Sequence, residues 1–293
     1  MAGDICTTVN MHLNASWSSG AIPVATSLTI IKSGLTGVLI DTGATEAGLD
    51  LGMIMTEPGC IASYGSAVAP IVTAADLVQI YGSGGFYLDC HNNGAAVKTD
   101  RVNVMAANKQ VPIILGSAAA ANAGDYVKIV CYRGNVTLKS GIKFEAGAQV
   151  IVRHIDSLAD VMLTIASGAE LLPVLTMEAG TCVSGGAITL AKIEKDATMT
   201  QDSAVITTAD VAGTLRMDHG FDTAALATGT PIATLIEVHS GGLLDLVTPD
   251  NTLYKEITDV VVFPGGRFRR NSSMHVVTNG VTDYTGGRGI LAA

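Results

Sequence analysis

Short stretches in which apolar and polar residues alternate recur along the chain. Residues 135–139, 142–145 and 214–218 place apolar side chains at every second position, and residues 234–239 and 243–247 are further β-branched or aliphatic runs. Alternation with a period of two is typical of a strand that buries one face. These segments predict an all-β fold.

Small residues separate the predicted strands and mark tight turns, because glycine readily adopts the positive φ that such turns need. The turns are expected at residues 33–34, 140–141, 146–147, 167–168, 179–180, 184–186, 240–242 and 264–266.

One unit returns three times along the chain: apolar, polar, apolar, any residue, then Ser-Gly. It occupies residues 136–141, 163–168 and 236–241. Such recurrence is typical of stacked β-turn-β units, as in a β-solenoid (a β-helix-like fold). The spacing of the units is irregular, so β-sandwich or barrel modules with Gly-rich turns remain an alternative.

Two short helices are also predicted. Residues 73–76 (Thr-Ala-Ala-Asp) form a capping box ahead of the apolar residues Leu77, Val78 and Ile80. Ser117 is placed to cap a brief helix over residues 118–121 that ends at Gly124.

The sequence pattern changes near residue 124. Before it, predicted strands are interspersed with Gly and Ala; after it, predicted strands and turns follow one another closely. We therefore expect a β-rich N-terminal domain with short helices over residues 1–123. A repetitive strand-turn domain would follow over residues 124–293.

The amino-acid composition restricts the classes of function that fit this chain. Only 15% of residues are charged, against about 25% in an average soluble domain, and 48% are hydrophobic although only 4% are aromatic. A chain so poor in charge is expected to bury surface against other subunits. The net charge of -9 and the pI near 5.0 disfavour nucleic acid as a partner.

The apolar runs of the chain and its first residues do not predict a membrane protein. No run reaches the ~18 apolar residues of a spanning helix, and the first residues lack the basic start and apolar block of a signal peptide. The five cysteines are scattered without the close spacing of a zinc or redox motif, so we expect buried free thiols in a protein made in a reducing cytoplasm.

The segment from Gly124 to Gly134 runs on through Ser140-Gly141 and closes at residues 146–150 (Ala-Gly-Ala-Gln-Val). This stretch resembles the core of bacteriophage head decoration or cement proteins. The resemblance implies a β-rich accessory protein bound to the outside of a capsid, often as a trimer. A longer, more repetitive chain of this kind would project as a head fibre.

Residues 38–44 (Val-Leu-Ile-Asp-Thr-Gly-Ala) resemble the active-site loop of retroviral-type aspartic proteases. That likeness implies a homodimer in which two copies of Asp41 share a proton. Residues 82–86 would be its Gly-rich flap and residues 113–116 the apolar step before its terminal helix. The long gap before the flap and the Ser-Ala-Ala after Gly116 depart from that pattern. The alternative role for Asp41 is a turn residue that closes a strand.

Other candidates for chemistry are few. Cys90 and His91 are adjacent and would point to opposite faces of a strand. The remaining histidines have no metal-ligand spacing, namely His12, His154, His219, His239 and His275. The basic cluster at residues 267–270 (Arg-Phe-Arg-Arg) suits a solvated strand face, an acidic neighbour or a phosphate.

The sequence therefore predicts a structural protein and no catalytic, cofactor-binding or metal-binding residue. It would assemble with itself, as a homotrimer, and with a major capsid protein on the virion surface, after synthesis in the host cytoplasm. No nucleic acid, membrane or small-molecule substrate is expected as a partner. The alternatives are the protease through Asp41 and a tailspike-like carbohydrate-binding β-helix. The carbohydrate-binding alternative needs aromatic side chains on which sugars stack, and the chain has only one Trp and seven Tyr.

Overall fold

The computed structural model describes residues 4–6, 27–39, 50–90, 98–116, 125–154, 161–218, 220, 231–248 and 253–292. Within these ranges every regular element is a β-strand and no helix is present. The predicted all-β class is confirmed. All the strand pairs formed by these residues are parallel, so each strand pairs with one that belongs to another circuit of the chain.

Most strands belong to one of two ladders. The first ladder runs, in order of pairing, through β1 (Asp4–Cys6), β2 (Leu28–Ile31), β4 (Asp50–Thr56), β7 (Ala74–Ile80), β10 (Arg101–Met105), β12 (Asp125–Leu138), β13 (Lys143–Val152), β15 (Leu172–Ser184), β16 (Ile188–Gln201), β17 (Ile206–Val211), β19 (Ala233–Val238) and β21 (Lys255–Val262), which pairs with β23 (His275–Val277) and β24 (Val281–Asp283).

The second ladder uses the later parts of the long strands. It runs through β3 (Val38–Leu39), β5 (Ser63–Tyr64), β8 (Phe86–Asp89), β11 (Pro112–Leu115), β12, β14 (Val161–Ile165), β15, β16, β18 (Thr214–Met217), β20 (Leu243–Asp245), β22 (Arg267–Arg270) and β25 (Ile290–Ala292). Two short strands complete the set: β6 (Ile71–Val72) beside β8 and β9 (Lys98–Thr99) beside β12.

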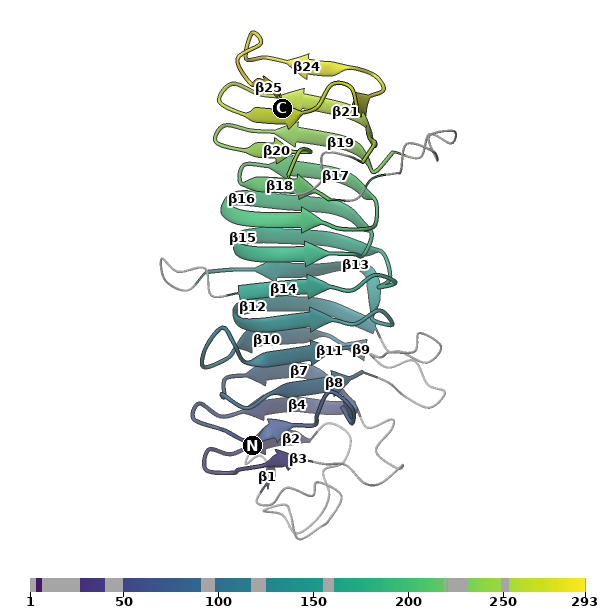
Figure 1. Cartoon of the computed structure of the whole chain (residues 1–293). Helices are drawn as coiled ribbons and strands as arrows, with labels where there is room; N and C mark the ends of the chain where they lie inside the picture. The colour runs from purple at the N-terminus through teal and green to yellow at the C-terminus, as the bar shows by residue number, and fades with distance from the viewer. Residues whose placement is uncertain are drawn as a thin grey trace.

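Successive circuits of the chain, called layers below, follow one another along a column, with β1 and β25 at opposite ends (Figure 1). The spacing between paired residues varies from 16, as between Leu175 and Ala191, to 29, as between Leu215 and Leu244. The connections between strands differ in length, and this difference accounts for the variation in sequence separation. For this reason the ladders stay in register although the sequence repeat is irregular.

The long strands pass from one ladder to the other at a bend. In β12, Ile129 belongs to the first ladder and Val136 to the second, and Gly134 lies between them with φ +141°. In β15, Gly180 occupies the corresponding place with φ +82°. A positive φ costs glycine little, so the chain turns a corner here without ending the strand. The turns predicted at residues 146–147 and 179–180 are therefore bends within strands.

Inward-facing side chains form one continuous core. Its first-ladder row contains Ile129, Val150, Leu175, Ala191, Ala209, Ile236 and Val260, all at most 1% exposed. Its second-ladder row contains Val136, Leu163, Cys182, Met199, Leu215, Leu244 and Phe268, also at most 1% exposed. Most of the residues that stack in these two rows are aliphatic, and Phe268 is the one aromatic residue among those named.

The helix predicted to begin at residues 73–76 and to continue over Leu77, Val78 and Ile80 is wrong. Residues 74–80 form β7, which pairs with β4 on one side and β10 on the other. Val78 and Ile80 point into the core. Two parallel neighbours satisfy the backbone of β7, and this tertiary pairing overrides the local capping signal. The second predicted helix, from Ser117 to Gly124, lies outside the described residues.

The strands expected at residues 135–139, 142–145, 214–218, 234–239 and 243–247 each overlap an observed strand, namely β12, β13, β18, β19 and β20, and each extends one or two residues beyond it.

Two of the three Ser-Gly units lie directly on one another. Val136 pairs with Leu163 and Leu138 with Ile165, and the two turns are in contact between Ser140 and Gly168. The third unit lies on the first ladder, in β19 and the turn that follows it.

The predicted boundary between residues 123 and 124 falls among residues that are not described. The strands β10 and β11, which come before this boundary, pair directly with β12, which comes after it. Hydrogen-bonded ladders therefore cross this position, and the division into two domains stays a prediction.

Candidate functional site

A cleft of about 320 Å³ opens on the outer side of the first ladder. It is lined by Lys192, Ile193, Glu194, Asp210, Ala212 and His239. Three charged residues of this region are in register across neighbouring strands: Lys192 of β16 pairs with Asp210 of β17, which pairs with Glu237 of β19. Parallel pairing therefore brings together side chains that are far apart in the sequence.

Asp210, Glu237 and His239 converge beside this cleft. Their ligand atoms, one from each side chain, all lie within 4.8 Å of one another, and all three residues are half-buried. Two carboxylates and an imidazole are a donor set for a divalent cation.

Sequence reasoning missed this trio because Asp210 comes from a different layer. The available signal was Glu237 and His239, which are two positions apart, where side chains share one face of a strand.

The ring of His239 is held in a stack of aromatic side chains. It lies parallel to Phe263, with centroids 4.9 Å apart and an interplanar angle of 4°. Phe263 stacks in turn on Tyr284 at 5.7 Å. The backbone N–H of His239 donates to the carbonyl of Val211, next to Asp210, at 2.8 Å. This contact fixes the position of the histidine relative to β17.

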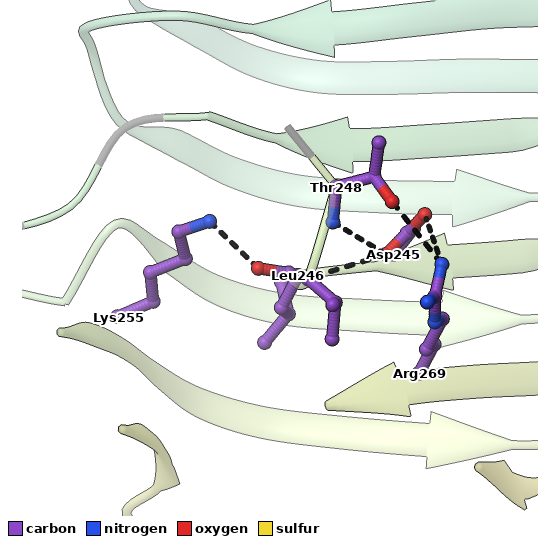
Figure 2. Close-up of polar contacts among 6 residues, drawn as sticks. Asp245, Leu246, Thr248, Lys255 and Arg269 are labelled. Carbon is purple, nitrogen blue, oxygen red and sulfur yellow. Dashed lines mark hydrogen bonds and ion pairs between the residues drawn. The ribbon is translucent and has the colours of Figure 1, made fainter. Parts of the chain in front are cut away.

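A polar network ties β20, β21 and β22 together (Figure 2). The Asp245 carboxylate accepts hydrogen bonds from the backbone N–H groups of Val247 and Thr248 at 2.9 and 3.0 Å. Its other oxygen lies 3.6 Å from Nη1 of Arg269, the residue with which Asp245 pairs in register. The Arg269 guanidinium also donates to the Thr248 hydroxyl at 3.1 Å.

Lys255 lies on the other side of Leu246 in this view and is fully buried. Its ammonium donates to the Leu246 carbonyl at 2.7 Å. Because a buried charge is costly without such partners, this contact is a structural restraint on the segment that follows β20.

His275 pairs in register with Lys255 and is also buried, at 1% exposure. Burial, with further contributions from the cations of Lys255 and Arg270, lowers the pKa of His275 to about 4. Its Nδ1 accepts the backbone N–H of Asn271 at 3.0 Å. The ring is therefore neutral at pH 7.

The three arginines of the basic cluster at residues 267–270 each have a different environment. Arg267 is exposed, Arg269 binds the acidic neighbour Asp245, and the guanidinium of Arg270 lies over the ring of Phe268, 5.6 Å from its centroid. The cluster is thus largely engaged within the protein.

The protease hypothesis stays a prediction, because Asp41 lies outside the described residues. The segment proposed as its flap, residues 82–86, is packed within the column. A Cβ at Gly84 would overlap the backbone carbonyl of Ala62, and Phe86 is buried in a stack with Tyr64 at 4.6 Å. Ile113 and Leu115 of β11 belong to the core.

All five cysteines are free and buried, as predicted. Burial raises the pKa of the Cys131 thiol to about 12, and it raises that of Cys182 still further. His91, His12 and His219 lie outside the described residues. His154 is exposed after β13.

The outer side of the second ladder carries a row of uncharged residues from β12 to β16, and it ends at β18, where the exposed Arg216 is in register with Thr200. This threonine face consists of Asn135, Thr137, Met162, Thr164, Thr181, Val183, Thr198 and Thr200. Met162 and Val183 on this face are 50% and 48% exposed.

Among the described residues there is no helix long and apolar enough to cross a membrane. In comparisons with known proteins, no family model, curated protein or solved structure matches the chain.

Proposed function

We propose that this chain is a virion structural protein, a capsid decoration or head-fibre protein that acts as an oligomer through a β-solenoid body. The parallel layers and the contact between successive Ser-Gly turns favour the solenoid over a sandwich. The resemblance of residues 124–150 to phage decoration proteins points to the capsid surface as its location.

The threonine face is the observation that carries this proposal. Charged residues normally keep an outer β face in water, yet this face has none over four successive layers. Threonine is stiff at χ1 and loses little freedom when its methyl and hydroxyl groups dock against a partner. Exposed Met162 and Val183 add apolar area. The proposed occupant is a second copy of this chain in a homotrimer, which would in turn bind the major capsid protein.

The oligomeric state tests this assignment. Light scattering behind a sizing column should give three times the 30.0 kDa chain mass for the wild type. Met162→Glu with Val183→Glu should shift the mass toward that of one chain, because two carboxylates without a compensating cation would be buried at the interface. Val68→Glu is the matched control, since Val68 is 95% exposed and outside the threonine face.

A wild type that remains at 30.0 kDa at every concentration would refute the homotrimer. Electron microscopy of the particle in which the chain occurs tests the location: labelled protein absent from the capsid surface would refute the virion role.

The aromatic stack supports a second candidate, a carbohydrate-binding surface. Tyr284 is 61% exposed at the end of the stack with Phe263 and His239, and the carboxylates of Asp210 and Glu237 lie near the other end. Sugars bind by stacking on aromatic rings and hydrogen bonding to carboxylates. A glycan array that shows binding lost in Tyr284→Ala would support this function, and a blank array would eliminate it.

A further inference from the structure

The carboxylates of Asp210 and Glu237 are held close together without a compensating cation. They occupy paired positions on β17 and β19, where side chains of one face are neighbours. Among the described residues neither carboxylate has a hydrogen-bond or ion-pair partner. Lys192 is in register with Asp210 but makes no ion pair with it, and Glu194 adds a further acidic group to the same cleft. Like charges opposite one another on a ladder are destabilising.

The imidazole beside these carboxylates narrows the choice of cation. Stacking on Phe263 fixes the plane of the His239 ring, so its nitrogens lie at the edge of the stack. A nitrogen donor beside two carboxylate oxygens suits first-row transition ions such as Zn²⁺ and Co²⁺, whereas Mg²⁺ and Ca²⁺ take oxygen ligands.

We propose that Asp210, Glu237 and His239 bind one divalent transition-metal ion of the zinc class beside the cleft. Zinc–ligand bonds of about 2.0–2.2 Å place ligand atoms about 3.4 Å apart in a tetrahedral site. The three donor atoms already lie within 4.8 Å of one another, which is close to this spacing. The cleft leaves the remaining coordination positions to water. The ion would add a side-chain link between β17 and β19, two strands that pair directly in the first ladder.

The site is independent of the proposed assembly role, because no residue of the threonine face takes part in it.

Calorimetric titration of the full chain, stripped of metal, with ZnCl₂ and with CoCl₂ tests the site. One equivalent should bind, and the Co²⁺ form should show the visible absorption of an ion with nitrogen and oxygen ligands. Zn²⁺ should raise the midpoint of thermal unfolding, because it binds the folded state only. Asp210→Asn, Glu237→Gln and His239→Ala should each weaken binding at least about tenfold.

Two controls match these changes elsewhere on the surface. Glu178→Gln removes a carboxylate that pairs with Arg153 at 3.2 Å, and His154→Ala removes an exposed histidine after β13. Both should bind Zn²⁺ as the wild type does. Circular dichroism checks that every variant is folded.

Failure to bind either ion would overturn the proposal, as would affinity unchanged in all three ligand variants. Binding of Ca²⁺ or Mg²⁺ as tight as that of Zn²⁺ would overturn the assignment of the ion class.

Discussion

Lys255 and His275 occupy paired positions on β21 and β23, and both are buried. The cation is bonded to the Leu246 carbonyl, and the imidazole beside it is kept neutral. Each residue therefore depends on the other: the lysine raises the cost of a charged His275, and the neutral ring leaves Lys255 without a second buried positive charge at its side.

The free energy of unfolding should decrease as the pH is lowered, because of His275. Its pKa is about 4 in the folded protein against 6.5 as the ordinary value. The unfolded chain therefore takes up a proton below about pH 6.5 that the folded protein refuses until about pH 4. The stability contribution is complete above pH 6.5 and is lost as the pH falls toward 4, by about 3 kcal/mol.

Urea unfolding at pH 7.5 and 4.5 measures this loss. In His275→Gln, whose side chain does not titrate, the difference in unfolding free energy between the two pH values should be smaller by about 2.5 kcal/mol, because the loss is not yet complete at pH 4.5. An equal pH dependence in both proteins would show that other groups account for it.

At the scale of elements, the corner between β17 and β18 shows how layers are packed. The backbone N–H groups of Ala212 and Gly213 both donate to the Ile193 carbonyl at 2.8 Å. The chain therefore passes so close to the layer before it that a Cβ at Gly213 would overlap the carbonyl oxygens of Glu194 and Ala197. By contrast, Gly280 has φ +89° and open space around its Cβ position.

Gly213→Ala should cost about 3 kcal/mol of unfolding free energy, because the overlapping atoms are backbone and cannot move away separately. Gly280→Ala should cost about 1 kcal/mol, from the unfavourable φ alone. Urea unfolding of both variants at one pH compares them, and equal losses would contradict the packing explanation.

Across the whole molecule, the core rows run without interruption from the first layers to the last. The cysteines can test this continuity, because Cys60 lies between β4 and β5, Cys182 lies in β15, and both are buried. Parallel ladders join β10 and β11 to β12 across residue 124, and this pairing predicts that the column opens as a single cooperative unit.

Native protein should therefore react with a thiol reagent at none of its five cysteines, and at all five in denaturant. In single-cysteine versions that keep Cys60 or Cys182, the labelling rates at increasing urea should give the same free energy of opening. Opening of Cys60 at lower urea than Cys182 would instead support separate domains over residues 1–123 and 124–293.

The sequence by itself determined the β class, the position of many strands, and the burial of the cysteines. Alternation within β18 or β19 is a local property, and so is the need for glycine at a bend such as Gly180. The helix predicted at residues 73–76 failed because β7 obtains its hydrogen bonds from β4 and β10, which no local signal reveals.

Only the tertiary structure decided which strands pair and which side chains meet. Asp210 reaches Glu237 and His239 because the two layers align in parallel register, although the chain between them is long. In the same way, the threonine face exists only when β12, β14, β15 and β16 are stacked. Register depends on connections of variable length, so it is a property of the assembled column and not of any one segment.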